Sequence, residues 1–191
     1  MGFVNYVDRL IAAFQAQLRH PWSADRSGGE RVWFLVIDPD KMRSVLAQKE
    51  AFRQAAQGAG KQWHEIDLTD TFGSWMASLE YANHYFARPQ RAASLPGDFV
   101  EWLRKDVERQ IQDAQLGRHS LLVLSGTESL FGLTKLSGVV HSIEDSVPGR
   151  LLVLFPGQYH QPQYRLLDAR DGWNYLAVPI LPISGQGGSI G

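Results

Sequence analysis

The chain has 191 residues, of which 19 are Lys or Arg and 20 are Asp or Glu, so its formal net charge is -1. Such a balance excludes a general electrostatic attraction to nucleic acid or anionic membranes. Cysteine is absent, which excludes disulfides, thiolate metal sites and a cysteine nucleophile, and is typical of a reducing compartment. We therefore expect a cytoplasmic protein, for which direct nucleic-acid binding is the least favoured function.

One domain is expected at this length, with roughly 70% of the unfolded surface buried on folding. It is predicted to span residues 1–183. The remaining segment, 184–191, is rich in Gly and Ser and is predicted to be a flexible tail. No stretch approaches the roughly 20 consecutive apolar residues of a membrane span, so no membrane association is expected.

The first predicted elements are a helix, a buried strand and a second helix. Apolar residues at helical spacing predict an amphipathic helix over about 5–19. Val32–Ile37 is a continuous apolar run, which is typical of a strand buried on both faces. Asp38-Pro39 then favours a helix start, because Asp caps free amides and Pro suits the first helical position. That helix is expected to end near Gly58 or Gly60.

Four further strands alternate with helices along the rest of the chain. The strands are predicted at 61–68, 120–124, 151–155 and 174–180. Three helices are predicted: one that carries Phe72 to Phe86, one over about Asp98 to Gln115, and one over Leu136 to Ile143. Pro179 should place the last strand at a sheet edge. This order predicts an α/β fold with a mostly parallel, five-stranded, doubly wound sheet flanked by helices.

In such a sheet, ligands bind beyond the carboxyl ends of the strands. The residues predicted there are mainly acidic: Asp38, Asp40, Asp67, Asp70 and Glu128, with Ser125. A P-loop needs G-x-x-x-x-G-K-[ST] after the first strand, and the chain has DPDKM instead. A phosphate about 6 Å from one carboxylate would be opposed by roughly 3 kcal/mol. The sequence therefore predicts the form of a P-loop ATPase core without Walker motifs and without a cofactor.

One enzymatic alternative uses the same acids. Asp38-Pro39-Asp40 resembles the D-x-D nucleophile and acid pair of haloacid-dehalogenase-type phosphatases, with Ser125 as a strand-end hydroxyl and Lys135 as the cation. Those Mg²⁺-dependent enzymes carry paired acids after a later strand, where this chain has Phe155-Pro156-Gly157. The competing interpretation is that both aspartates only cap a turn. The histidines show no spacing typical of a metal site.

Three segments together are similar to one protein family. They are FLVIDPDKMRSVL through HEIDL, then LLVLSGTESLFGLTKLSGVVHSI, and PGRLLVLFPGQY followed by NYLAV. These segments resemble the BrxB family, bacterial proteins encoded in BREX phage-defence operons. The similarity runs from about Val32 to Val178. The most distinctive part is Val147-Pro148 leading into Phe155-Pro156-Gly157-Gln158-Tyr159.

The resemblance implies a non-catalytic component that associates with the PglZ-type alkaline-phosphatase-superfamily protein of the operon, and with other BREX components. Within the distinctive segment, Pro156 and Gly157 predict a sharp turn that ends the fourth strand. Two interpretations of Tyr159 and Tyr164 stay open: they pack beside the strand, or they project toward the partner as aromatic anchors. A third function, DNA binding, is suggested only by scattered basic residues such as Arg88 and Arg91.

Overall fold

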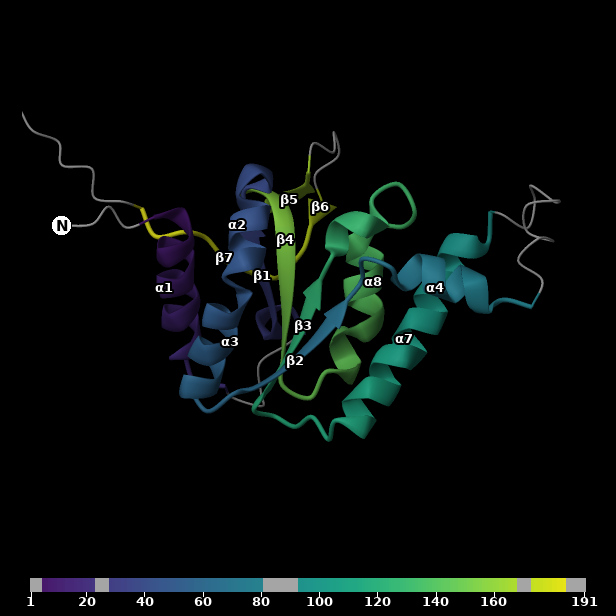
Figure 1. Ribbon diagram of the computed structural model, residues 1–191, viewed down its shortest axis with the longest axis horizontal. Helices are drawn as coiled ribbons and strands as arrows, with labels where there is room; N and C mark the ends of the chain where they lie inside the picture. The colour runs from purple at the N-terminus through teal and green to yellow at the C-terminus, as the bar shows by residue number, and fades with distance from the viewer. Residues whose placement is uncertain (1–4, 23–27, 81–92, 168–172, 185–191) are drawn as a thin grey trace, which may run out of the picture.

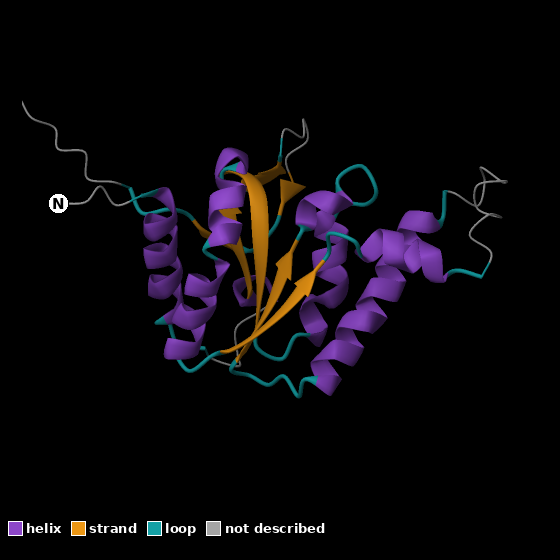
Figure 2. Ribbon diagram, in the orientation of Figure 1, coloured by secondary structure: helices purple, strands orange, loops and turns teal. Residues whose placement is uncertain are grey.

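The computed structural model describes residues 5–22, 28–80, 93–167 and 173–184. Its centre is a sheet with helices on both faces (Figures 1 and 2). Five strands run parallel in the order β2-β3-β4-β1-β7. They are β1 (Val32–Ile37), β2 (Gln62–Asp67), β3 (Ser120–Ser125), β4 (Arg150–His160) and β7 (Val178–Ile180). The predicted α/β fold with a mostly parallel, doubly wound sheet is confirmed.

Figure 1 views the sheet from its β2 edge, with one layer of helices on each side. One layer contains α1 (Tyr6–Leu18), α2 (Met42–Ala47) and α3 (Lys49–Gly58). The other contains α4 (Thr71–Ser78), α7 (Leu95–Asp113) and α8 (Leu136–Ile143). Successive side chains of a strand point to opposite faces, so Trp33 packs in the first layer and Phe34 in the second. All six residues of β1 are buried, as its apolar run predicts.

The segment after β1 begins as predicted and then breaks. The Asp38 side chain caps the turn Pro39–Lys41 by accepting the Asp40 N–H, and Pro39 lies in the first helical turn. One continuous helix was expected to follow. Two form instead, because Gln48 leaves helical geometry at φ -109° and ψ 17° and separates α2 from α3. The end of α3 at Gly58 agrees with the prediction.

The predicted turn at Pro156-Gly157 is wrong, because β4 continues through both residues to His160. Pro156 still pairs with Ile37 of β1, and Gly157 begins an antiparallel pairing with β5 (Gln163–Leu166). Gly157 permits this close approach, since a Cβ atom there would lie 2.1 Å from the Arg165 carbonyl oxygen. The chain reverses only at Gln161-Pro162, so the distinctive segment is one arm of a hairpin.

The last predicted strand is divided in two. β6 (Trp173–Asn174) pairs with β5, and β7 pairs with β1 at the edge of the sheet, where Pro179 was expected. The α7 helix begins at Leu95, three residues before the predicted start near Asp98, and Pro96 lies in its first turn. Phe86, Arg88, Arg91 and the tail after Ser184 lie outside the described residues. None of the described helices is long and apolar enough to cross a membrane.

Candidate functional site

The first place to look for a ligand is the crevice between the carboxyl ends of β1 and β4. The chain leaves β1 toward β2 on one side of the sheet and leaves β4 toward β7 on the other. Neighbouring strands whose connections run in opposite directions form a topological switch point, where ligands bind in doubly wound sheets. In this protein the carboxyl end of β4 continues as the β4–β5 hairpin instead of ending there.

Tyr164 of β5 fills the space over these two strands. Its side chain is fully buried, and its ring centroid lies 4.6 Å from that of Phe34 in β1 and 5.8 Å from that of Phe155 in β4. The Tyr164 hydroxyl donates a 2.8 Å hydrogen bond to the carbonyl oxygen of Ala177. Burial raises the pKa of this hydroxyl, because it disfavours the charged phenolate. The hairpin thus closes the switch point on the α8 side with the protein's own aromatic rings.

The same geometry corrects the expectation that Tyr164 reaches a partner, because a fully buried ring presents no surface. Tyr159 differs, since it is only partly buried and its ring centroid lies 4.7 Å from that of Tyr164. Tyr159 packs against the edge of the same core cluster. For Tyr164 the packing interpretation therefore holds, and Tyr159 keeps an exposed part.

Asp38 and Asp40 lie at the end of β1, where both are exposed. The Asp38 backbone N–H donates to the Tyr6 hydroxyl of α1 over 2.9 Å. Ser125 ends β3, and β4 runs between β3 and β1, so Asp38 and Ser125 are separated by two strand spacings, about 10 Å. The register also places Asp38 three residues, about 10 Å, further along the strand direction. The Ser125 hydroxyl instead donates to Glu65 Oε1 over 2.6 Å. The structure therefore does not bring the predicted nucleophile and hydroxyl together.

Two further polar residues near these strand ends have structural positions. Lys135 is the N-cap residue of α8. The Thr127 hydroxyl is buried and donates to the Leu154 carbonyl oxygen over 2.8 Å. Within the described ranges, no group of three His, Cys, Asp or Glu side chains is placed to hold a metal ion.

The turn after β2 packs closely against the turn after β3. The Asp67 carboxylate accepts the Thr69 N–H at 2.9 Å and the Thr69 hydroxyl at 2.6 Å, and these hydrogen bonds lower the pKa of Asp67. Gly126 lies opposite with φ 66°, a left-handed conformation that suits glycine. A Cβ atom on Gly126 would lie 2.6 Å from Asp67 Oδ1. Asp67 is therefore a structural acceptor in this conformation.

Sequence reasoning missed a polar cluster on the α3 side of β2. Glu65 Oε1 accepts from both the Ser125 hydroxyl and the Lys49 ammonium, the latter over 2.8 Å. Lys49 is the first residue of α3, and Ser125 belongs to another strand. Asp67 pairs with Ser125, and Glu65 lies two residues before Asp67, so Glu65 and Ser125 face the same side of the sheet. Strand periodicity could have indicated this shared face. The position of Lys49 depends on the helix break at Gln48, for which the sequence carries no clear signal.

The chain was compared with protein-family models, curated proteins and solved structures, and none of the three comparisons gives a match. The resemblance to the BrxB family therefore rests on the sequence motifs alone.

Proposed function

We propose that the protein is a non-catalytic component of a bacterial BREX-type anti-phage defence system. In this proposal it works in the cytoplasm as an interaction module that associates with the PglZ-type alkaline-phosphatase-superfamily protein, without a cofactor. The motifs from Val32 to Val178 supply the link to the BrxB family. The fold supplies the argument that the module is not an enzyme.

The observation that carries the argument is the β4–β5 hairpin at the switch point. Tyr164 packs on Phe34 and Phe155 where a doubly wound enzyme would hold its ligand. A ligand could enter from the α8 side only after this aromatic packing was lost, and burial of an aromatic side chain contributes about 3 kcal/mol or more. Because a core residue fills this site, the observation supports a role in which the protein acts through its surface rather than through a ligand-binding cleft.

The polar groups beside the hairpin support the same proposal. A phosphatase needs its nucleophile and the groups that bind phosphate within about 3 to 4 Å of the reacting atoms. Asp38 caps a turn, whereas Ser125 lies across β4 and donates to Glu65. Asp38 and Asp40 therefore form a capped turn, and no contact among the described residues favours the Mg²⁺-dependent phosphatase alternative.

Calorimetry with two titrants tests the proposal. Titration with the PglZ-type protein of the same operon should give a 1:1 complex with a dissociation constant of about 1 μM or tighter, which corresponds to about -8 kcal/mol. Titration with Mg-ATP should give no heat of binding. Absence of a complex at tens of micromolar would contradict the proposed function.

An activity assay separates the module from the phosphatase. Neither the wild type nor Asp38→Asn should hydrolyse an aryl phosphate in the presence of Mg²⁺. Turnover by the wild type that disappears in Asp38→Asn would make the phosphatase the better account. Asp8→Asn is the matched control, because it makes the same chemical change in the first turn of α1.

A further inference from the structure

The β2 edge of the sheet is open. β2 is the last strand in the order β2-β3-β4-β1-β7, and among the described strands it pairs only with β3. Figure 1 shows β2 at the near edge, between the helices of the two layers. An open edge offers a row of backbone groups to any extended chain that can reach it.

The hydrogen bonds to β3 show which groups face outward. The Gln62 N–H donates to His119, and the Leu68 N–H donates to Ser125. Because backbone groups alternate sides along a strand, the even-numbered residues of β2 face β3 and the odd-numbered residues face outward. By this alternation the backbone N–H and C=O groups of Trp63 and Glu65 point away from β3, and among the described residues no backbone hydrogen bond from outside the β2–β3 pair reaches them. Two residues of β2 therefore have free donors and acceptors at the proper spacing for another strand.

Three hollows follow this edge from one end to the other. The first adjoins Gly60 and Gln62, the second adjoins Trp63, His64 and Glu65, and the third adjoins Asp67. Their volumes are about 600, 260 and 340 Å³. A docked strand would therefore find a hollow beside the start, the middle and the carboxyl end of β2.

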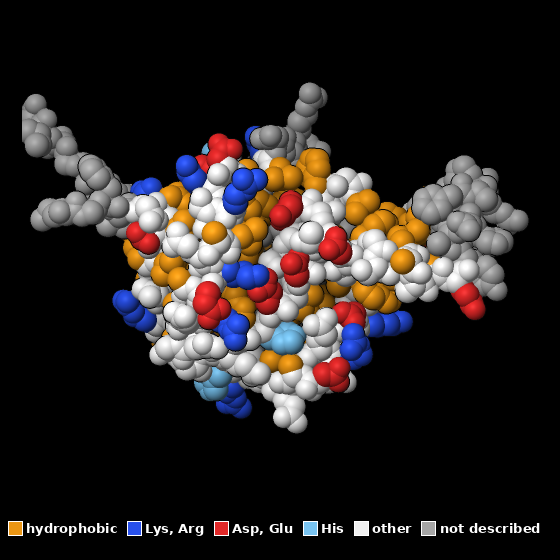
Figure 3. Space-filling model, viewed as in Figure 1, with side chains coloured by type: hydrophobic (Ala, Val, Ile, Leu, Met, Phe, Trp, Pro, Cys, Tyr) orange, Lys and Arg blue, Asp and Glu red, His pale blue; other side chains and the backbone are white. Residues whose placement is uncertain are grey.

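The hollow at the carboxyl end of β2 is acidic. Asp67, Asp70 and Asp106 line it together with Trp102, and its lining includes no Lys or Arg. Asp106 is already paired with Arg109 and accepts a hydrogen bond from Gln110. Asp70 is exposed, and no hydrogen bond or ion pair of its side chain is formed among the described residues. Figure 3 shows acidic side chains gathered over this end of β2. A Lys or Arg side chain would be attracted by the carboxylates and could lie against the indole ring.

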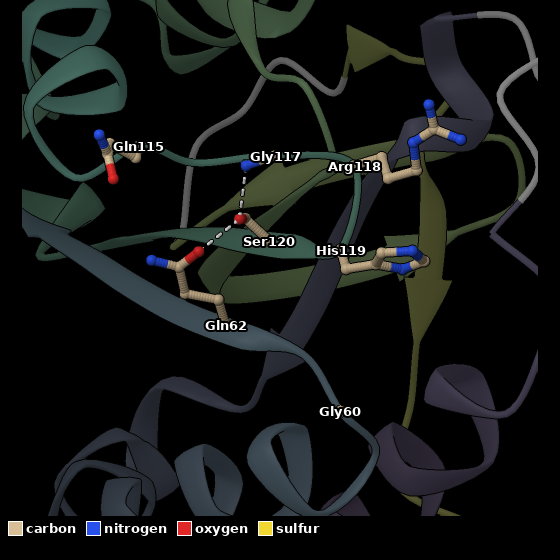
Figure 4. A pocket seen from close by; sticks show the side chains of 7 residues that line it. All are labelled: Gly60, Gln62, Gln115, Gly117, Arg118, His119 and Ser120. Carbon is tan, nitrogen blue, oxygen red and sulfur yellow. Dashed lines mark hydrogen bonds between the residues drawn. The ribbon is translucent and has the colours of Figure 1, made fainter.

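The hollow at the start of β2 has the opposite character. It is lined by Arg118 and His119 and includes no acidic residue. Figure 4 shows the Ser120 hydroxyl bonded to Gly117 and Gln62, with Arg118 and His119 extending away from it. Arg118 and His119 are exposed, so an acidic side chain could approach them. The hollow at the start of β2 is thus basic, the middle one has Lys49 and Arg53 beside Glu50 and Glu65, and the one at the carboxyl end is acidic. The six residues of β2 span about 17 Å.

We propose that the open edge of β2 is the docking site for an extended segment of the partner protein, which adds to the sheet as a strand of about six residues. The segment carries a basic side chain for the hollow of Asp67 and Asp70, and an acidic side chain for the hollow of Arg118. This inference rests on the proposed function, because the partner is the PglZ-type protein. It adds the surface and the chemistry by which that partner is recognised.

Residue-resolved amide hydrogen exchange, measured by NMR on the full chain alone and in complex with the PglZ-type protein, tests the geometry. The amides of Trp63 and Glu65 should exchange at least about tenfold more slowly in the complex. The amides of His64 and Ile66, which face β3, should already be slow in the free protein. This pattern would support strand addition.

Other outcomes overturn the inference in distinguishable ways. A complex that leaves the Trp63 and Glu65 amides unchanged, or that protects the exposed Phe131 and Leu133 instead, refutes strand addition and leaves the proposed function standing. Absence of a complex refutes both. Slow exchange of Trp63 and Glu65 in the free protein that becomes fast on dilution identifies a second copy of the chain as the occupant, and also overturns the inference.

A charge reversal tests the recognition chemistry. Asp70→Lys should weaken the complex about tenfold, since a basic side chain of the partner would meet a like charge. Asp40→Lys is the matched control, because Asp40 is also an exposed acid that follows a strand and lies at the end of β1. The control should bind as the wild type does. Equal affinity of both variants and the wild type would overturn the assignment of a basic residue to this hollow.

Discussion

The β4–β5 hairpin and the β2 edge lie in the same sheet, but the hairpin closes its part of the sheet whereas the β2 edge stays open. At the hairpin, backbone groups of β4 beyond Pro156 pair with β5, and Tyr164 covers the space where a ligand would enter. At the β2 edge, Trp63 and Glu65 keep their outward backbone groups free of hydrogen bonds within the described chain. The position at which such folds usually bind ligands is closed, and a position that many proteins protect is open.

This difference is the basis of our proposal that the protein acts through contact with another protein. A closed switch point removes the usual place for small-molecule chemistry, whereas an open strand edge provides backbone recognition without a cleft. The following predictions test the two regions separately, through the stability of the first and the interactions of the second.

The largest expected effect is at the hairpin. Tyr164→Ala removes a fully buried ring that contacts Phe34 and Phe155, so it should lower the free energy of unfolding by about 4 kcal/mol. Tyr164→Phe keeps the ring and loses only the hydrogen bond to Ala177, so about 1 kcal/mol is expected. Chemical denaturation measures both. Equal and small losses would show that the ring is not part of the core.

A smaller loss is expected from Gly157→Ala, which tests how closely the hairpin arms approach. The added Cβ atom would lie 2.1 Å from the Arg165 carbonyl oxygen and 2.7 Å from a ring carbon of Phe155. The arms must therefore separate, at a cost of about 2 kcal/mol. Gly138→Ala in α8 is the control, because nothing lies within 4 Å of the added atom. A stable Gly157→Ala protein would contradict the pairing of Gly157 with Leu166.

At the β2 edge, Lys49→Met should cost only about 1 kcal/mol. The variant leaves the partly buried Glu65 with the Ser125 hydroxyl as its hydrogen-bond donor. Lys105→Met makes the same chemical change at an exposed pair with Glu101, where no measurable loss is expected. If both variants unfold at the same denaturant concentration, Glu65 and Lys49 form no more than a solvated surface pair.

The smallest effect is the pH dependence contributed by Asp67. Its folded-state pKa lies below its unfolded value because Thr69 donates two hydrogen bonds to the carboxylate. The carboxylate therefore stabilises the fold above the unfolded pKa, and this contribution disappears as the pH falls through the folded pKa. Wild type and Asp67→Asn should converge in stability as the pH falls below about 4, the ordinary pKa of an aspartate. Thr69→Val should reduce the pH dependence of the wild-type protein, and an unchanged profile would contradict the assignment.

Much of the fold could be predicted from the sequence because its strongest patterns are local. The apolar run Val32–Ile37 became a fully buried strand, and Asp38-Pro39 capped the turn that follows it. The hairpin could not be predicted in the same way. Pro156 and Gly157 are typical turn residues, and their place inside a strand depends on pairing with Ile37 and Leu166, which are distant in the sequence.

The candidate site was harder to predict than the fold. The acids at the strand ends were identified from the sequence, but the strand order separates Asp38 from Ser125, and a single sequence does not specify that order. Tyr164 was identified as a notable aromatic residue, and its burial follows from the hairpin that the sequence did not reveal. The open edge of β2 is likewise a property of topology rather than of any motif.

Hydrogen exchange on the free, dilute protein tests the contrast between the two regions most directly. The Leu167 amide, which donates to the Pro156 carbonyl oxygen across the hairpin, should exchange slowly, as should the inward amides of His64 and Ile66. The Trp63 and Glu65 amides should exchange about 100-fold faster than these. Protection of Trp63 and Glu65 equal to that of His64 and Ile66, or rapid exchange of Leu167, would contradict a sheet that is closed at the hairpin and open at β2.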